Sequence, residues 1–411
     1  MAISTNFAPP FKLISPYFII ASIFYILSLL FLFTFDISNI EILNTNVLAF
    51  VHLLLLAFVM MVILGAMAQL IPVVLEVEHF AVELYYIIYP LLLIGSILMF
   101  FGFLNSPLLL PFGGLIVLIA MLIFVFETLL TIIKVKKINL VISTVALANI
   151  FLFIGLIFGI LMSLGYAGII NIDISQYLFA HIYLVLIGYV GVTIMGMSLI
   201  LLPMFWLSHS YSSKPTKYAL YFISTAIFLI ISNIIINSEL ISSIAYLLSL
   251  ISFLLYFYQI FIIYKTRVRM DNDFYLKSMK ISYSSLLIAI VFALYYFFDS
   301  SNNILLTISW VLTMGFISFV INGHLYKIIP FLVWFERFSP LVGKQKVPML
   351  ADIVPNKSAQ IQMIFNFFGF IISAIGIFTM NNSIFYSGIS FMAFGASFLL
   401  KDVLYMINYK G

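Results

Sequence analysis

Cysteine is absent from the 411-residue chain, and charged residues make up only 8% of it. Without cysteine, the chain cannot itself form a disulfide, a thiolate metal site or an iron–sulfur cluster. The low charge argues against a soluble protein, because soluble domains carry about 25% charged residues. The P-loop, the dinucleotide fingerprint, the nucleophile elbow and the HExxH motif are missing as well, which removes the enzyme classes that depend on them.

Long apolar runs fill the sequence instead. Hydrophobic residues make up 65% of the chain, and the mean hydropathy is +1.25. Runs of about 20 apolar residues are long enough to span a bilayer as a helix. The sequence therefore predicts an all-α polytopic membrane protein, a single transmembrane domain over 1–411 with the lipid bilayer as its first partner. Twelve spans are predicted, at 13–35, 46–75, 82–104, 107–134, 139–166, 175–206, 217–237, 240–264, 280–298, 303–335, 359–380 and 383–405.

One segment occurs three times, as ILGAMAQLIPVV at 63–74, IMGMSLILLPMF at 194–205 and INGHLYKIIPFL at 321–332. Each copy has a glycine seven residues before a proline within an apolar frame, and such self-similarity indicates an internal repeat. The copies lie on predicted helices 2, 6 and 10, so they recur every four helices. We therefore predict three pseudo-threefold four-helix repeats, at about 13–134, 139–264 and 280–405.

Charge in the loops predicts the orientation. All 18 Lys and Arg residues fall on one side of the predicted helices, whereas the opposite loops carry only acidic residues. The positive-inside rule then places both termini in the cytoplasm, with the protein integral to the inner membrane of the cell. The net charge of +4 belongs to these loops and implies no nucleic-acid partner. The cytoplasmic connection 265–280 reads as a solvated turn, and 336–358 as an ordered loop.

His52 and His181 are the candidate ligands of a metal or haem. They lie 20 and 22 residues before the prolines of their repeats (72 − 52 = 20, 203 − 181 = 22), so both are about 30 Å from the proline end of the helix. Neutral imidazole is a common ligand of haem iron, copper and zinc. Tyr183 and Trp310 lie 20 residues before the prolines of the second and third repeats and are predicted to line the pocket. The alternative is that each imidazole only binds a backbone carbonyl.

Three further groups of polar residues have weaker signals. His324, Tyr326 and Lys327 form a polar patch near the cytoplasmic end of helix 10, a possible second site with a structural or substrate-binding role. His79 and His209 occupy equivalent cytoplasmic loop positions, where a solvated face is the simpler reading than a metal site. Glu127, taken as the one carboxylate inside a predicted helix, is expected either to relay protons or to pair with a loop lysine.

This arrangement resembles the haem-copper oxidase superfamily, and most closely its NnrS-like membrane proteins. The resemblance is carried by FVHLLLLAF at 50–58, AHIYLVLIGYVGVTIMGMSLILLPMF at 180–205 and GHLYKIIPFLVW at 323–334. It implies that His52 matches the low-spin haem ligand on helix 2. Helix 10 has Trp310 rather than histidine at that level, and helix 7 lacks the histidine pair for copper. A complete dioxygen-reducing centre is therefore not expected.

Three functions follow as expectations. The first is a haem- or metal-binding membrane protein in respiratory or nitric-oxide-related metabolism, with haem as the cofactor. The second is a membrane transporter, although the common six-plus-six transporter repeat does not match a recurrence every four helices. The third is a non-catalytic subunit of a respiratory complex, which would make the other subunits of that complex its partners. In the last two cases the chain needs no cofactor, and whether it is an enzyme is left open.

Overall fold

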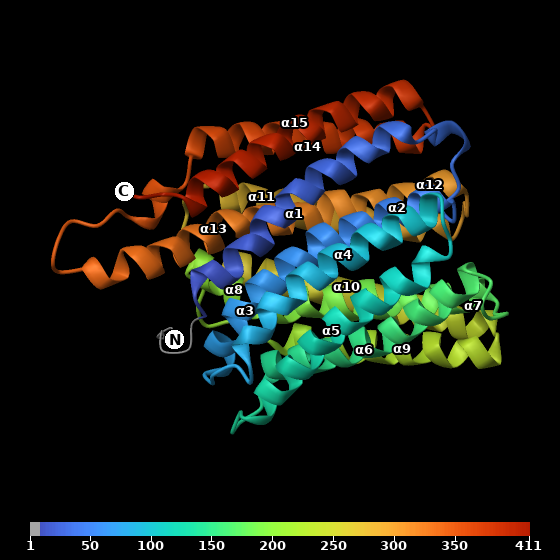
Figure 1. Cartoon of the computed structure of the whole chain (residues 1–411), viewed down its shortest axis with the longest axis horizontal. Helices are drawn as coiled ribbons and strands as arrows, with labels where there is room; N and C mark the ends of the chain where they lie inside the picture. The colour runs from blue at the N-terminus through green and yellow to red at the C-terminus, as the bar shows by residue number, and fades with distance from the viewer. Residues whose placement is uncertain (1–8) are drawn as a thin grey trace. The chain divides into compact units, whose positions relative to one another are not determined.

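Twelve apolar helical spans build the described part of the chain, residues 9–411, in a computed structural model (Figure 1). Within these residues there is no β-strand, only an isolated bridge between Ser208 and Arg267. The prediction of an all-α chain with twelve spans is thereby confirmed. The spans are Phe11–Thr34, Thr45–Leu75, Val82–Leu104, Leu109–Ile133, Leu140–Tyr166, Ile174–Trp206, Lys214–Ile236, Glu239–Lys265, Phe274–Tyr296, Asn302–Arg337, Asn356–Phe378 and Asn382–Ile407.

Spans 2, 6 and 10, which carry the repeated segment, are the longest, at 31, 33 and 36 residues. In the most apolar part of each, 67% of the residues are buried, against at most 44% in any other span. A helix that is apolar and buried all round belongs to the interior, whereas one with exposed apolar residues faces lipid. Each of the three long spans is therefore an inner helix of the unit that contains most of it, and we call the three spans the inner helices.

Each inner helix contains a π-helical segment, and each of these segments ends shortly before the repeat glycine. The first inner helix, span 2, runs through α2 (Thr45–Leu54), η4 (Leu55–Met60) and α3 (Met61–Leu75). The second runs through α7 (Ile174–Ile182), η6 (Tyr183–Gly191) and α8 (Val192–Trp206). The third runs through α12 (Asn302–Trp310), η7 (Val311–Ile317) and α13 (Ser318–Arg337). Such segments are rare in proteins and occur often at functional sites.

The repeat glycines allow close approach of a neighbouring helix. A Cβ added at Gly65 would lie 2.8 Å from the Cβ of Tyr17 in α1 (Phe11–Phe31), and one at Gly196 would collide with Thr144 in α6 (Leu140–Tyr166). At Gly323 the added atom would lie 2.6 Å from Met279 in α11 (Phe274–Tyr296). In every case the neighbour is the first helix of the same predicted repeat. This shared contact is what three related four-helix repeats require.

The chain divides into two compact units whose boundary falls inside α3. Unit 1 contains 71–102 and 106–271, and unit 2 contains 9–70, 103–105 and 272–411 among the described residues. Each unit thus groups six spans, and the first predicted repeat contributes to both. The division into units reflects how densely the helices pack, whereas the predicted repeat states that three groups of four helices can be superposed. The threefold repeat therefore stays a prediction.

Unit 1 is built around the second inner helix. Its other helices are α4 (Tyr85–Leu104), preceded by η5 (Val82–Leu84), then α5 (Leu109–Ile133), α6, α9 (Lys214–Ile236) and α10 (Glu239–Lys265). Helix α6 packs along α7, η6 and α8, and α9 packs along α10. Buried hydroxyls join the helices, as between Ser198 and Tyr256, whose oxygens are 2.6 Å apart.

Unit 2 combines the first two spans with the last four. Its closest helix pair is α14 (Asn356–Phe378) and α15 (Asn382–Ile407), which lie side by side (Figure 1). Helix α1 packs along α15, and α11 packs against η7 and α13. Short helical turns complete the unit: η2 (Leu32–Thr34), η3 (Ile37–Asn39), η8 (Ser339–Leu341) and η9 (Leu350–Ile353).

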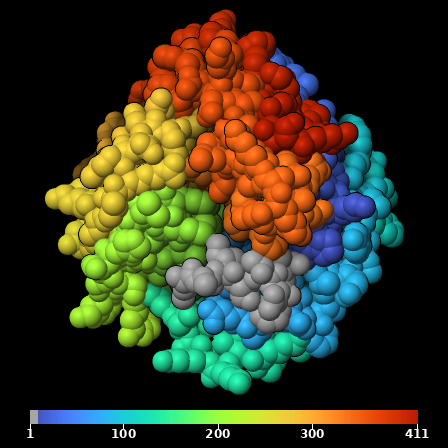
Figure 2. Space-filling model, turned by 90° about the vertical axis from the view of Figure 1, so that its left-hand side faces the viewer, coloured from blue at the N-terminus to red at the C-terminus, as the bar shows by residue number. Residues whose placement is uncertain are grey.

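The loops of unit 2 gather at two ends. At one end, the Asn382 amide donates to Asp36 (2.6 Å) and the Asn302 amide to the carbonyl of Ile40 (2.7 Å). At the other end, Arg337 donates to the carbonyl of Tyr409 (2.6 Å), and the loop after α13 lies beside the C-terminal residues, orange and red in Figure 2. The lysines and arginines of the unit belong to this second end, which we call the basic end. This agrees with the predicted alternation of the spans.

Two predictions about the loops had different outcomes. Residues 336–358 do contain ordered structure, including η8 and η9, and the Trp334 indole donates to the carbonyl of Pro348 (2.7 Å). The solvated turn at 265–280 was predicted too long, because α11 already begins at Phe274. The Asp273 carboxylate caps that helix by accepting from the amide of Leu276 (2.8 Å). Such a cap satisfies an amide of the first turn and lets the helix begin among charged residues.

Candidate functional site

His52 lies in α2, seven residues after the first residue of its span (52 − 45 = 7). Its Nδ1 is 2.8 Å from the carbonyl oxygen of Leu48, one turn earlier in the same helix. A carbonyl partner fixes the tautomer with the proton on Nδ1, so that Nε2 carries the lone pair. The ring packs on Phe103, with 4.8 Å between ring centroids.

His181 occupies the matching place in α7, also seven residues into its span (181 − 174 = 7). Its Nδ1 is 2.9 Å from the carbonyl oxygen of Gly155, on the neighbouring helix α6. A Cβ added at Gly159 would lie 3.1 Å from the imidazole Cε1, so the glycine leaves room for the ring. Metal-binding histidines commonly use one nitrogen on a carbonyl or carboxylate and the other on the metal.

Tyr183 and Trp310, the predicted pocket residues, contact neighbours within their own units. The Tyr183 ring lies 6.1 Å from that of Tyr246 in α10. The Trp310 indole donates to the hydroxyl of Ser373 in α14 (3.0 Å) and stacks on Phe50 at a centroid distance of 6.5 Å. Phe50 precedes His52 by two residues, so the two side chains project from opposite faces of α2.

The patch of His324, Tyr326 and Lys327 is present at the basic end of α13, and each member has its own partner. His324 binds the carbonyl of Val320 through Nδ1 (2.7 Å) and the Tyr275 hydroxyl through Nε2 (3.2 Å). The ammonium of Lys327 donates to Asp273 at 2.8 Å. The Tyr326 hydroxyl donates to Oδ2 of Asp402 in α15 at 2.7 Å. Since both nitrogens of His324 are engaged, its contacts favour a structural role.

Asp402 corrects the expectation that Glu127 is the one carboxylate inside a helix. It lies within α15, and the residue is 0% exposed. The sequence signal was weak, because Asp402 is only three residues from the predicted end of its span. A buried ionisable residue in a membrane helix is a candidate functional site by default.

His79 pairs with Glu127 in the interior of unit 1, which the sequence did not predict. The imidazole Nδ1 is 2.7 Å from Glu127 Oε1, and both side chains are at most 3% exposed. The amide of Phe80 (3.2 Å) and the hydroxyl of Thr131 (2.9 Å) also donate to this carboxylate oxygen. The expected loop lysine does not pair with Glu127. Lys134 donates instead to the carbonyl of His79 (3.0 Å).

His209 is exposed, as predicted for a solvated face, so it is not equivalent to His79. The two residues follow their repeat prolines by similar numbers of residues. Of the two, His79 is the one that pairs with a carboxylate, that of Glu127 on helix α5. No group of three or more His, Asp or Glu side chains within residues 9–411 could hold a metal ion. A bare metal with three protein ligands of these types is therefore not supported by the described residues.

Perturbed pKa values outside the spans belong to loop contacts. Hydrogen bonds from Asn382, Ser38 and Asn39 hold the pKa of the Asp36 carboxyl well below its usual range. The Ser175 hydroxyl and amide lower the pKa of Asp173 in the same way. Partial burial raises the pKa of Tyr211. Asp36 and Asp173 cap helices, and Tyr211 donates to the carbonyl of Leu199.

Comparison with known proteins adds no assignment. No protein-family model and no curated protein sequence matches the chain. The relationship to haem-copper oxidases and NnrS-like proteins accordingly stays a prediction that rests on the quoted sequence stretches.

Proposed function

We propose that the protein is a haem-binding integral membrane protein of respiratory or nitric-oxide-related metabolism, with His52 of unit 2 and His181 of unit 1 as its candidate haem ligands. One observation carries the proposal. The two imidazoles lie at the same place in related inner helices, just before a π-helical segment, and each has its Nδ1 on a backbone carbonyl. In that tautomer Nε2 is the atom that can bind iron.

The donor set fits haem better than a bare metal ion. Haem iron already has four ring nitrogens and needs at most two axial ligands from the protein, whereas structural or catalytic zinc needs three or four. Two imidazoles without a third His, Asp or Glu in the described residues meet only the first demand. When bound, haem would supply electron transfer or the binding of a diatomic gas. Tyr183 is the aromatic group expected to line its edge. Trp310, also predicted to line the pocket, stacks on Phe50 at the face of α2 opposite His52, which does not favour that role.

The test is the visible spectrum of the detergent-purified protein, oxidised and reduced, with a pyridine haemochrome assay. We expect a Soret band in the wild type and its loss or strong weakening in His52→Ala and in His181→Ala. His209→Ala is the matched control, because that imidazole is exposed and should not matter. His79→Ala is unsuitable as a control, since it would leave the buried Glu127 without its partner. A wild-type preparation without haem from cells that produce it would sink the proposal.

Membrane transport is the second candidate function, and Asp402 is the observation that favours it. Intramembrane carboxylates often belong to ion or proton pathways. A transporter needs no haem, so the same spectrum separates the two candidates. A non-catalytic subunit of a respiratory complex is the third candidate function, and the other subunits of that complex would then be its protein partners.

A further inference from the structure

Four side chains in the interior of unit 2 have polar atoms that no group in the described residues satisfies. They are Asn322 in α13, Gln362 and Asn366 in α14, and Asp402 in α15, each at most 1% exposed. In each of the three amide side chains, neither the nitrogen nor the oxygen has a hydrogen-bond partner among the described residues. Oδ1 of Asp402 has none among them either. An unsatisfied polar group inside a membrane costs several kcal/mol. These groups therefore call for a small ligand that both donates and accepts hydrogen bonds.

The four residues follow one another along the packed helices. Gln362 and Asn366 are one turn apart on α14, and Ser358 is one turn nearer the basic end, so all three share a face. The antiparallel packing against α15 brings Ser358 to Lys401 and Asn366 to Gly395, which places Gln362 between these levels. On α13, Asn322 lies one turn deeper than Tyr326. The polar side chains of both helices thus lead toward Asp402.

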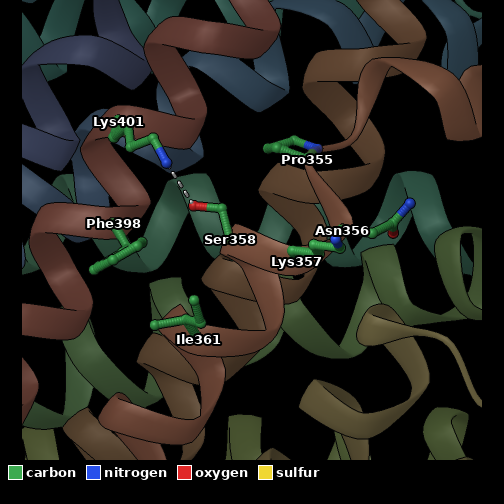
Figure 3. A pocket seen from close by; sticks show the side chains of 7 residues that line it. All are labelled: Pro355, Asn356, Lys357, Ser358, Ile361, Phe398 and Lys401. Carbon is green, nitrogen blue, oxygen red and sulfur yellow. Dashed lines mark hydrogen bonds between the residues drawn. The ribbon is translucent and has the colours of Figure 1, made fainter.

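A surface pocket opens at the basic end of unit 2, and its lining includes Lys401, the residue before Asp402 (Figure 3). The pocket has a volume of about 460 Å³ and is lined by Pro355, Asn356, Lys357, Ser358, Ile361, Phe398 and Lys401. Lys401 donates to the Ser358 hydroxyl at 3.3 Å. Ser358 is only 8% exposed and also neighbours Asp402, so it stands between the pocket and the buried carboxylate.

We propose that Asp402 is a proton-binding site, which exchanges protons with the basic end of unit 2 through the pocket at Ser358 and Lys401. Oδ2 already accepts from the Tyr326 hydroxyl, so the proton is added to Oδ1, the oxygen without a partner. One O–H bond forms there as one O–H bond of a hydronium ion in the pocket breaks, and a neutral water molecule remains. Gln362, Asn366 and Asn322 bind further waters, as buried polar groups commonly do.

The elements packed against α15 carry further charged and titratable groups. Helix α13 brings Tyr326, Lys327 in its pair with Asp273, and Glu336, which accepts from the amide of Phe11. Helix α14 brings Lys357. Helix α1 carries Lys12, Tyr17 and Tyr25, and α15 itself carries Lys401. The inference is independent of the haem proposal, and it would supply the coupling ion that a transport function needs.

Labelling with dicyclohexylcarbodiimide tests the proton site in the full-length protein, because this apolar reagent modifies protonated carboxyls in apolar surroundings. Mass spectrometry should find an adduct on Asp402 that declines as the pH rises and is lost in Asp402→Asn. Asp352, an exposed carboxylate of the same unit, is the internal control and should stay unmodified. Tyr326→Phe removes a donor to the ionised form, so the pH of half-labelling should move upward. A folded wild type without an Asp402 adduct at any pH, or with one insensitive to pH, overturns the proposal.

Cysteine accessibility tests the route, and a chain without native cysteine makes each single-cysteine variant unambiguous. A charged, membrane-impermeant thiol reagent should modify Ser358→Cys rapidly and Gln362→Cys more slowly. Asn366→Cys is the second variant if Gln362→Cys does not fold. Ile389→Cys, at an apolar position of α15 that is 0% exposed, should resist the reagent. If the cysteine at Gln362 or Asn366 is as resistant as the one at Ile389, water does not fill the polar interior of unit 2. If the cysteine at Ser358 is as resistant, the route through the pocket is wrong.

Discussion

At the scale of single residues, the five histidines show what sequence can and cannot assign. Position in the repeat predicted that His52 and His181 belong together, and the structure gives both the same kind of Nδ1 partner. His79 and His209 also matched in position, yet one is buried on a carboxylate and the other is exposed. The difference lies in Glu127, which is 48 residues away from His79 and reaches it only through the packing of α5. Helical periodicity contains no information about such a partner.

Breaking the His79–Glu127 pair should destabilise the protein strongly. Glu127→Ala removes the oxygen that accepts from the Phe80 amide and contacts the imidazole, and each buried donor left without an acceptor costs about 1–3 kcal/mol. Thermal unfolding in detergent should show a large loss for Glu127→Ala. His209→Ala, at an exposed position, should stay within about 0.5 kcal/mol of wild type. Equal stability of the two variants would show that the pair does not support the fold.

Asp36 gives a prediction for pH. Its pKa is lower in the folded protein than in the unfolded chain because Asn382, Ser38 and Asn39 hydrogen-bond the ionised carboxylate. The ionised form therefore stabilises the fold above about pH 4, and this contribution is lost as the pH falls below that value. Asp36→Asn should lower the melting temperature at pH 7, and the difference from wild type should shrink below about pH 4. A difference that is the same at both pH values would contradict this account.

At the scale of elements, the sequence located the helices well but missed their local geometry. Apolar run length predicted the bounds of most spans to within a few residues, because crossing a bilayer requires that length. The start of α11 was missed by six residues (280 − 274 = 6), since Lys277 and Lys280 looked like a loop. The π-helical segments were not predicted at all. The residues in them are mostly apolar, with Tyr183, Tyr189 and Thr313 as the exceptions, and no residue type sets these segments apart from the rest of the spans.

Two glycines of the second inner helix form a matched pair for testing close approach. Gly196→Ala would place its Cβ against Thr144 of α6, and overpacking of this kind costs about 1–3 kcal/mol. Gly191→Ala, five residues earlier, meets nothing nearer than the Leu186 carbonyl oxygen at 3.6 Å. That variant should be neutral or slightly more stable, because alanine favours a helix over glycine by up to about 1 kcal/mol. Unfolding in detergent should rank Gly196→Ala below Gly191→Ala, and the reverse order would remove the proposed role of the repeat glycine.

At the scale of the whole molecule, the number of spans was predictable and their grouping was not. The sequence repeat relates helices that lie about 130 residues apart in the chain, whereas the compact units follow which helices pack most densely. Helices α1 and α2 belong to unit 2 because they pack with the last spans of the chain, as in the contact of α1 with α15. A repeat identifies related segments, but it does not say which of them are neighbours.

Orientation in the membrane is the last prediction at this scale. In the sequence, all 18 basic residues fall on one side of the predicted alternation of spans, and the loops predicted on the other side have none. The positive-inside rule then predicts that the basic loops and both termini face the cytoplasm. A reporter fused after Asn105, between the third and fourth spans, should read the non-cytoplasmic side, and one fused after Lys410 the cytoplasmic side. Inserting three lysines after Asn105 should weaken this orientation, because it opposes the charge difference that sets it, whereas three serines there should not. If the two fusions of the unmodified chain report the same side, either a predicted span does not cross the membrane or the charge rule does not govern this protein.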